Sequence, residues 1–506
     1  MFSAGWLLRA AFFGKIAVVA FAVEKRIFLR KNTIAIPRDE IEKQYGYMNE
    51  FREINEVFYR QNGKMPLACV RNFGCQMNEH DSEKLAGMLE NMGFALDAWE
   101  AHQPEEFQLI IFNTCCVREN AEEKVFGHLG ALKAAKRSNP DMMICVCGCM
   151  TEQPHVVQEI RQKYKNVDLV FGTQNLHTFP ELLLECKNQN THVYNTQHSE
   201  GRVAEGVPIK RADRLKAWVT VMYGCNNFCS YCIVPYVRGR ERSRASADIL
   251  QEVRELDAAG IQEITLLGQN VNSYGKDKEA ELSFAKLLEA ICQETSIPRI
   301  RFMTSHPKDL SDELIDVMAA NPRICRQLHL PVQSGSTEVL RRMNRRYTAE
   351  QYLALVDKVR KKIPDIALST DVIVGFPGET EEDFQATLDL MAKVRYDMAF
   401  TFIYSKRQGT PAAEWENQVP EDVVKERFAR LLELQNGIDR EINETYVGRT
   451  VKVLAEGRSR TNPERYTGRT TENKIVNFTG DRDASGEIIE VLIDEAATWS
   501  LGGKMK

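Results

Sequence analysis

Short apolar runs alternate with amphipathic stretches along most of the chain from Pro66 onward. This alternation is typical of buried parallel strands that are joined by crossover helices. Four strands and three helices are predicted in the first part of the series. The strands are residues 67–72, 109–113, 142–147 and 167–171, and the helices are residues 79–91, 118–136 and 151–164. We therefore expect a small, doubly wound parallel-sheet α/β domain at residues 66–185.

A second alternating series predicts a larger α/β domain at residues 211–445. Its six strands are residues 218–223, 263–267, 300–304, 327–330, 366–374 and 398–404, and the helices between them are centred near Leu250, Leu287, Leu314, Leu353 and Leu388. Six βα repeats favour a partial or full barrel, a fold that keeps its chemistry at the carboxyl ends of the strands. The polar, unpatterned residues 186–210 are predicted to form a linker between the two domains.

The last part of the chain changes character after a charged helix at residues 421–446. Three short β-rich segments follow, at residues 451–455, 474–478 and 487–493. They predict a small antiparallel β-barrel at residues 446–506, which is a size at which nucleic-acid-binding barrels occur.

Basic residues are concentrated in this predicted barrel. Between Arg449 and Lys474 the sequence has seven basic residues against three acidic ones. Such a local excess is a weak signal for an RNA-binding surface, with Arg460 and Arg469 as candidate contacts. Two aromatic residues either stack on bases or belong to the core, namely Tyr466 and Phe478.

Residues 1–65 precede the first predicted domain and include a mostly apolar stretch at residues 6–23. Arg9 and Lys15 interrupt this stretch, and its longest clean run has eight residues, too few to cross ~30 Å of hydrocarbon. Three interpretations of residues 1–47 stay open: a non-native extension before a start at Met48, a helix lying on a membrane surface, or a cleaved signal. We expect a cytoplasmic location without a stable membrane partner, because export would suit the many thiols badly.

The composition is that of an ordinary globular protein, with 43% hydrophobic and 27% charged residues. It excludes a disordered or low-complexity chain. The net charge of −5 means that any nucleic-acid partner must be held by a local patch. Thirteen cysteines are the unusual feature. They are clustered and odd in number, in a chain too long to need disulfides, which favours metal binding.

Three of these cysteines form a C-x3-C-x2-C loop directly after the first strand of the predicted barrel. They are Cys225, Cys229 and Cys232. Three thiolates on one tight loop hold three irons of a cubane cluster and leave the fourth iron open to another ligand. A structural zinc site would need a fourth ligand close by and usually uses C-x2-C pairs. The loop therefore predicts an iron–sulfur cluster.

Three further cysteines each follow a predicted strand of the first sheet. They are Cys75, Cys115 and Cys149. Parallel strands deliver these positions to one edge of the sheet, so the three thiols are expected to converge as ligands of a second cluster. Adjacent or alternate neighbours remain possible substitutes, namely Cys116, Cys145 and Cys147. The other four cysteines are predicted to pack in the core, namely Cys69, Cys186, Cys292 and Cys325.

The C-x3-C-x-aromatic-C loop, with Tyr231 as its aromatic residue, resembles the motif of the radical S-adenosylmethionine superfamily. Within that superfamily the chain from about residue 66 to residue 493 resembles the methylthiotransferases. The matching stretches are FGCQMNE at residues 73–79, NTCCVRE at 113–119, IVPYVRGRERSR at 233–244 and GFPGET at 375–380. The VRE continuation at residues 117–119 makes it most similar to the members that act on tRNA. Cys116 departs from the family pattern, in which a small residue such as serine is expected.

The resemblance implies two four-iron four-sulfur (4Fe-4S) clusters and S-adenosylmethionine. The cluster at Cys225, Cys229 and Cys232 would generate a 5′-deoxyadenosyl radical, with electrons from a donor such as flavodoxin or ferredoxin, and the second cluster would donate sulfur. The implied substrate is a tRNA anticodon stem-loop that carries N6-isopentenyladenosine. Its C2 position would receive a methylthio group at the expense of two S-adenosylmethionine molecules. The resemblance also implies a terminal TRAM domain that binds RNA, and we expect a monomer.

Two other functions stay open at this point. One is methylthiolation of an aspartate in a ribosomal protein, which needs the same clusters. The other is a non-catalytic iron–sulfur protein that binds RNA or transfers electrons.

Polar residues near the predicted strand ends are candidates for holding the cofactor. They are Tyr231, Gln269, Asn270, Gln333 and Ser334. Gln269 and Asn270 fit a capped turn equally well, and His306 fits a turn as well as a site. Four arginines follow the cluster loop in alternation, and three of them are candidate substrate contacts, namely Arg238, Arg240 and Arg244. The alternative for these arginines is a solvated basic strand.

Overall fold

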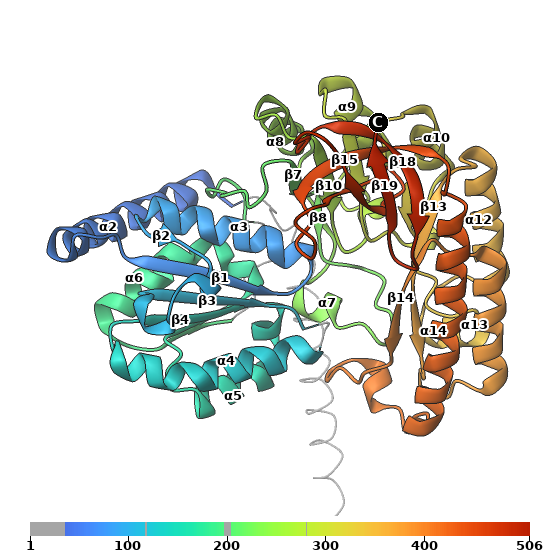
Figure 1. The fold of residues 1–506 in the computed structure, drawn as a ribbon. Coiled ribbons are helices and arrows are strands. Elements are labelled where there is room, and N and C mark those ends of the chain that lie inside the picture. Colours follow the sequence, from blue (N-terminus) through green and yellow to red (C-terminus); the bar gives the residue numbers. More distant parts are fainter. Residues whose placement is uncertain (1–35, 117–118, 197–203, 280) are drawn as a thin grey trace, which may run out of the picture.

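Six parallel strands form the amino-terminal sheet in the computed structural model, which describes residues 36–116, 119–196, 204–279 and 281–506 (Figure 1). The strand order is β2-β1-β3-β4-β5-β6. The strands are β1 (Leu67–Phe73), β2 (Ala95–Leu96), β3 (Leu109–Thr114), β4 (Met143–Gly148), β5 (Leu169–Phe171) and β6 (Val193–Asn195). All four predicted strands are present, and β2 and β6 are short strands at the two edges.

Helices cover both faces of this sheet, because successive side chains of a buried strand point to opposite sides. In β3, Leu109 and Ile111 join one core, whereas Ile110 and Phe112 join the other. The first core is closed by α2 (Arg38–Asn62), α3 (Gln76–Asn91) and α6 (Phe179–Gln189), and the second by α4 (Glu119–Ser138) and α5 (Pro154–Lys163). The doubly wound architecture is therefore confirmed.

The structure differs at two places from the organisation expected around this domain. Helix α2 begins at Arg38 and runs through Met48 without a break, and its Gln44 donates a hydrogen bond to Glu181 of α6 at 3.0 Å. A start at Met48 would therefore cut through a packed helix. The predicted linker 186–210 contains the end of α6 and strand β6, which pairs with β5. Strand β6 was not predicted, because it consists of three half-buried residues and has no apolar run.

The apolar stretch at residues 6–23 lies outside the described residues. Among the residues that the structure does describe, no helix is both long and apolar enough to cross a membrane.

The central domain is a partial barrel of two parallel three-stranded sheets. One has the order β11-β10-β7 and the other β12-β13-β14, and a parallel bridge between Ile300 and Ile324 connects them. The strands are β7 (Lys216–Thr220), β10 (Glu263–Leu267), β11 (Arg299–Phe302), β12 (Gln327–His329), β13 (Ala367–Val374) and β14 (Met398–Ile403). In the described part of the chain β7 and β14 are not paired with each other, so the barrel is open on that side.

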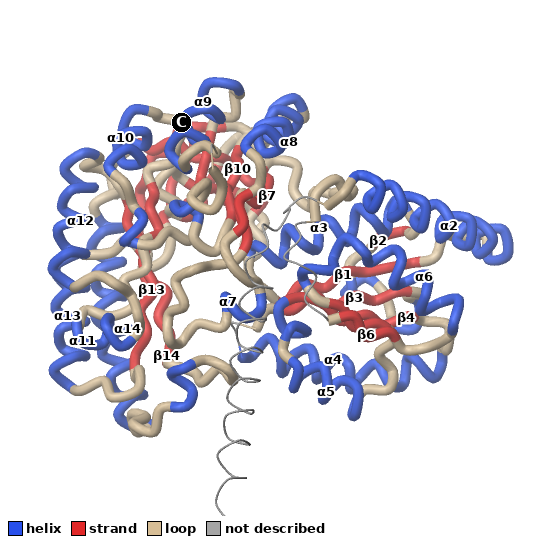
Figure 2. The backbone as a smooth tube through the Cα atoms, turned by 180° about the vertical axis from the view of Figure 1, so that it is seen from behind, coloured by secondary structure: helices blue, strands red, loops and turns tan. Residues whose placement is uncertain are grey.

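Helices cover the outside of the partial barrel (Figure 2). They are α8 (Ser246–Ala258), α9 (Phe284–Glu294), α10 (Asp312–Ala320), α12 (Ala349–Lys362) and α13 (Glu381–Val394). Each contains the centre that the sequence predicted. The strand predicted at residues 218–223 is divided in the structure into β7 and β8 (Met222–Tyr223), and β8 pairs with β9 (Arg242–Ser243). Strand β9 and the short helices α7 (Val234–Val237) and α11 (Thr337–Arg342) were not predicted, because each has six residues or fewer.

The terminal domain is a closed five-stranded barrel that follows helix α14 (Glu421–Glu444). Its strands are β15 (Thr450–Arg458), β16 (Tyr466–Arg469), β17 (Ile475–Thr479), β18 (Ile488–Ala496) and β19 (Leu501–Met505). All neighbours are antiparallel except β17 and β19. Tyr466 and Phe478 stack on each other in the barrel core and are 2% and 0% exposed, so they do not offer faces to bases.

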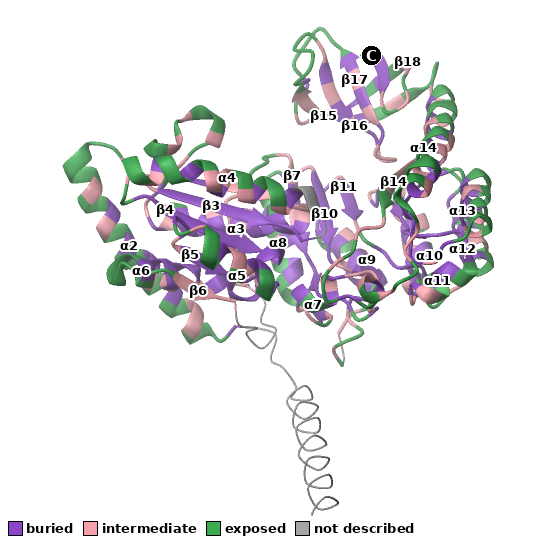
Figure 3. Ribbon diagram, turned by 90° about the horizontal axis from the view of Figure 1, so that it is seen from below, coloured by how far each residue is buried: buried purple, intermediate pink, exposed green. Residues whose placement is uncertain are grey.

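Buried arginines attach this terminal barrel to the amino ends of the central strands. Arg299 donates to the backbone carbonyls of Arg469 and Lys452 at 2.6 and 3.2 Å. Arg301 donates to the carbonyl of Thr470 at 2.6 Å. The terminal barrel therefore lies at the end of the central barrel opposite the carboxyl ends of its strands. Figure 3 shows it beside the end of α14, with buried residues next to exposed ones along its strands.

Replacing Arg299 with alanine is expected to loosen this attachment. The change removes two hydrogen bonds from a charged donor to backbone carbonyls of the barrel, so the free energy of unfolding of the terminal barrel should fall by about 2–4 kcal/mol. Urea denaturation with limited proteolysis between α14 and β15 measures this. Arg482→Ala is the control, because Arg482 pairs with Glu487 on the exposed surface and its loss should leave the midpoint unchanged. An equal midpoint for both variants would contradict the assigned role of Arg299.

Candidate functional site

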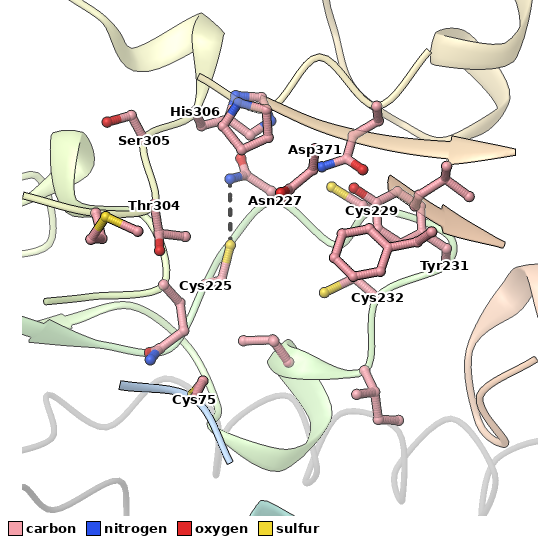
Figure 4. A pocket seen from close by; sticks show the side chains of 18 of the residues that line it. Cys75, Cys225, Asn227, Cys229, Tyr231, Cys232, Thr304, Ser305, His306 and Asp371 are labelled. Atoms are coloured by element: carbon pink, nitrogen blue, oxygen red, sulfur yellow. Dashed lines mark hydrogen bonds between the residues drawn. The ribbon is translucent and has the colours of Figure 1, made fainter. Parts of the chain in front are cut away.

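The C-x3-C-x2-C loop begins at a turn that requires glycine. Gly224 has φ +74°, and a Cβ at this position would collide with the carbonyl of Arg240. The turn follows β8 and sends Cys225, Cys229 and Cys232 into the carboxyl end of the central barrel. All three cysteines line one cavity of about 440 Å³ (Figure 4).

The environment of these three thiols suits a metal cluster. Burial raises the pKa of the Cys225 thiol to about 11 and raises that of Cys232 as well, so without a cation both stay protonated. A bound cation reverses this preference, because a coordinating thiol is deprotonated. No three ligating side chains of the described residues surround one point as a single metal ion requires. A cubane instead takes one thiolate at each of three separate irons, which three spaced cysteines can supply.

The second set of cysteines converges at the carboxyl edge of the amino-terminal sheet. Cys75 precedes α3, Cys115 follows β3 and Cys149 follows β4. The ends of the three strands are in register, with Phe73 opposite Thr114 and Thr114 opposite Gly148. The hydrogen bond with Cys115 lowers the pKa of Cys75 to about 7, and hydrogen bonds with Cys115 and Cys116 lower the pKa of Cys149 well below its usual value.

The three alternative ligands separate in the structure. Cys145 and Cys147 belong to the core beneath α3 and α6, and burial raises the pKa of both thiols. Cys116 is buried but makes a side-chain hydrogen bond with Cys149, so it lies next to the second cysteine set. The four cysteines predicted as packing residues are buried or half-buried, namely Cys69, Cys186, Cys292 and Cys325.

One member of the second set reaches the cavity of the first. Cys75 lines it together with Gln76 and Met77, opposite the barrel residues that carry the first set. Cys115 and Cys149 are buried and do not line it. In Figure 4 the Cys75 segment enters the view from a part of the chain different from the Cys225–Cys232 loop. The two sets, about 150 residues apart at Cys75 and Cys225, thus meet at one cavity.

Three of the five predicted cofactor contacts line this cavity, namely Tyr231, Gln269 and Gln333. Gln269 also accepts a hydrogen bond from the backbone N–H of Gly224, which ties it to the cysteine loop. The other two candidates, Asn270 and Ser334, do not line it. Asn270 points away and donates to Asp309 at 2.9 Å, and Ser334 is buried against Thr387 at 3.3 Å. Gln269 and Asn270 are adjacent, as are Gln333 and Ser334, and only the first residue of each pair lines the cavity.

Two of the arginines predicted as substrate contacts are internal. Arg238 binds Asp81 at 3.0 Å, and Arg244 binds Glu205 at 2.6 Å, so neither offers its charge to a substrate at the surface. Arg240 is exposed and lies over the ring of Phe228 at 4.3 Å.

The two candidates in the terminal barrel differ. Arg460 is exposed. Arg469 is half-buried, and its Nε lies 3.6 Å from Oε1 of Glu456. Its backbone carbonyl accepts a hydrogen bond from Arg299. Much of the charge of Arg469 is therefore balanced within the protein.

Several cavity residues were missed by the sequence analysis. Arg345 donates to Cys229 Sγ at 3.6 Å and to the carbonyl of Pro331 at 2.6 Å, yet no local pattern marks it. Asp371 had a signal, because it is an acidic residue inside the apolar strand β13. Thr304 lines the cavity with φ +69°, a strained conformation for a β-branched residue that is found mainly at functional sites.

His306 also lines the cavity, which favours the site over the turn alone. Its Nδ1 accepts a hydrogen bond from the backbone of Lys308, and its buried Nε2 has no hydrogen-bond partner among the described residues. Burial lowers the pKa of this imidazole far below its usual value, so it is neutral.

Three family models match consecutive parts of the chain. Residues 68–172 match the "Uncharacterized protein family UPF0004", residues 219–391 the "Radical SAM superfamily" and residues 444–506 the "TRAM domain". Among solved structures, the radical S-adenosylmethionine methyltransferase TsrM from Kitasatospora setae, with cobalamin and a 4Fe-4S cluster bound, is 18% identical. It covers 77% of this chain and 81% of its own with a TM-score of 0.50, which supports the fold alone.

Two curated relatives are much more similar, and both are named tRNA-2-methylthio-N(6)-dimethylallyladenosine synthase. The protein from Acetivibrio thermocellus is 57% identical over 94% of this chain and 98% of its own length, and that from Clostridioides difficile strain 630 is 54% identical over the same shares. The radical SAM match implies a 4Fe-4S cluster and S-adenosylmethionine as cofactors. With this identity over nearly the whole of both chains, the protein belongs to the tRNA-2-methylthio-N(6)-dimethylallyladenosine synthase family of radical SAM methylthiotransferases.

Proposed function

We propose that this protein inserts a methylthio group at C2 of N6-isopentenyladenosine next to the anticodon of tRNA. The proposal assigns one 4Fe-4S cluster to Cys225, Cys229 and Cys232 and a second to Cys75, Cys115 and Cys149. The observation that carries it is the single cavity lined by Cys75 and by all three cysteines of the loop. A reaction that uses one centre to make a radical and another to supply sulfur needs both within reach of one substrate carbon.

The clusters and S-adenosylmethionine, when bound, supply radical and sulfur-transfer chemistry that no side chain provides. The residues of this chain hold and orient these groups. Gln269, Gln333 and Asp371 present polar atoms to the cavity beside the loop, where an amino acid moiety and a ribose need hydrogen bonds. Met303, Ile373 and Phe402 make part of the wall apolar and limit the access of water.

Arg345 has a role of its own in this proposal. Its guanidinium is buried and bonded to Cys229 Sγ, so it offsets part of the negative charge that three thiolates and a cluster bring into the barrel.

Three partner assignments belong to the same proposal. The substrate is tRNA, as the names of the relatives and the TRAM match suggest. A small electron-transfer protein such as flavodoxin or ferredoxin supplies the reducing electron. The protein acts as a monomer, because one chain contributes both cysteine sets to the cavity.

The test combines metal content with a nucleoside assay. Anaerobically reconstituted protein should contain about eight iron and about eight sulfide per chain. In a knockout strain, expression of the protein should add one methylthio group to the isopentenyladenosine of bulk tRNA, measured by mass spectrometry of nucleosides. An unchanged tRNA nucleoside profile would overturn the proposal. In that case a methylthio group on a ribosomal-protein aspartate, found by peptide mass spectrometry, would identify the protein-modifying alternative.

Separate replacement of Cys115 and of Cys116 with serine shows which of the two is a ligand of the second cluster. Cys115→Ser should lower the iron content from about eight to about four per chain, because one of three thiolates is lost. Cys116→Ser should retain about eight, since Cys115 remains next to Cys149 as the third thiol of the set. The reverse result would assign Cys116 as the ligand.

A further inference from the structure

One buried guanidinium connects the two cysteine sets. Arg238 follows helix α7, six residues after Cys232, but its side chain leaves the barrel and enters the amino-terminal domain. Its Nε donates to Cys149 Sγ at 3.1 Å, and its Nη2 donates to Asp81 Oδ2 at 3.0 Å. The side chains of Arg238 and Asp81 are 5% and 7% exposed. The segment that follows the Cys225–Cys232 loop is thus hydrogen-bonded to a thiol of the second cysteine set.

The position of Arg238 is fixed from both sides. Its carbonyl accepts a hydrogen bond from Arg242 Nη2 at 3.0 Å, and its own N–H bonds to the carbonyl of Val234 at 2.8 Å. Asp81 lies in α3, six residues after Cys75, so the helix that starts at one thiol also carries the carboxylate that orients the guanidinium.

Pairing with Asp81 explains why the charge of Arg238 is tolerated in the interior, but it does not explain the bond to sulfur. A buried guanidinium must be paired and hydrogen-bonded. The planar fork lets one group engage a carboxylate through Nη2 while Nε points elsewhere. Here Nε points at Cys149, whose other close neighbours are the thiols of Cys115 and Cys116. A hydrogen-bond donor to the Cys149 sulfur would change the electronic properties of a metal cluster bound by that sulfur.

We propose that Arg238 is a positioning residue for the amino-terminal cluster, holding Cys149 in its ligating orientation and stabilising negative charge on that cluster from the barrel side. The inference deepens the proposed function and rests on its assignment of Cys149 as a ligand. Hydrogen bonds to ligating sulfurs are one of the factors that set the reduction potential of an iron–sulfur cluster. A cationic donor favours the reduced, more negative form, so Arg238 makes the potential of this cluster less negative. Through its contacts with Cys149 and Asp81, Arg238 also holds the amino-terminal domain against the barrel in the orientation in which Cys75 faces the cavity.

The test isolates the amino-terminal cluster. In the full chain, Cys225, Cys229 and Cys232 are replaced with alanine, so that only the second set can bind iron. Arg238→Gln and Arg238→Lys are made in this background. Each protein is reconstituted anaerobically, its iron is counted, and the reduction potential is determined by titration followed by electron paramagnetic resonance.

Arg238→Gln should shift the potential to a more negative value. Arg238→Lys keeps a charge that can pair with Asp81 but loses the fork that also reaches Cys149, so it should shift the potential in the same direction by less. Arg240→Gln is the matched control, because Arg240 lies two residues along the same loop, is exposed and stacks on Phe228. It should leave the potential unchanged.

A potential in Arg238→Lys equal to that of the parent would overturn the inference, even where Arg238→Gln fails to fold. A shift of the same size in Arg240→Gln would also overturn it, because the effect would then be one of general charge. Cys149→Ala in the same background tests the underlying assignment separately. Loss of its iron supports Cys149 as a ligand, whereas unchanged iron content refutes the ligand assignment itself rather than the effect of Arg238.

Discussion

Replacing Cys225, Cys229 and Cys232 with alanine is expected to abolish the release of 5′-deoxyadenosine from S-adenosylmethionine. These three thiols are the cavity-lining members of one loop, and no other cysteine except Cys75 lines the same cavity among the described residues. Without them the cluster that binds the cofactor has no ligands. The measurement is liquid chromatography of nucleosides after anaerobic reduction with dithionite. Release should fall to the level of a protein-free sample.

Cys292→Ala is the control for this triple replacement. Cys292 lies in helix α9 on the outside of the barrel, where it is half-buried and far from the cysteine loop in the fold. Its removal should leave the release of 5′-deoxyadenosine unchanged. Release that persists in the triple variant would rule out the loop as the radical-forming site.

Replacing Cys75 with alanine is expected to separate the two halves of the reaction. Sulfur insertion into tRNA should be lost, while 5′-deoxyadenosine should still be released. The reason is that Cys75 is the one member of its set that lines the cavity, whereas the radical-forming loop is held by its own turn at Gly224. Nucleoside mass spectrometry of tRNA and the nucleoside assay above are run on the same reaction mixture.

Cys69→Ala is the matched control for Cys75. Cys69 lies six residues earlier, in strand β1, and packs in the core on the face covered by α4 and α5. Both products should form in this variant. Methylthio insertion that continues in Cys75→Ala would refute the assignment of Cys75 to the sulfur-donating centre.

The interface between the first two domains places the sets opposite each other. His80 of α3 bonds to Thr220 of β7 at 2.6 Å, and Arg211 connects Glu83 with Glu252 at 3.0 and 2.5 Å. These groups are mostly buried, and their paired charges allow few other arrangements of the two domains. The cavity therefore depends on contacts that are distant from the cysteines in sequence.

Periodicity was sufficient to predict the main elements of the fold. The apolar runs are strong in β3, β10 and β13, and the predicted bounds of these strands agree with the observed bounds to within one residue. It failed for β6, β16 and β19. Strand β6 lacks an apolar run, β16 is the four residues Tyr466–Arg469, and β19 contains two consecutive glycines. Such strands form because neighbouring strands supply their hydrogen-bond partners, and that information is not local.

The sequence by itself determined the chemistry that is available: three cysteines on one short loop and three more at the ends of neighbouring parallel strands. Both follow from short-range rules, since loop spacing fixes which thiols lie together and strand direction fixes which edge of the sheet they reach. Only the tertiary structure decided that Cys75 shares a cavity with the loop, that Arg238 turns inward to Cys149 and Asp81, and that Asn270 and Ser334 turn away. The physical reason is that the direction of a side chain at a domain interface is set by burial and charge pairing with distant segments, and no local pattern encodes these partners.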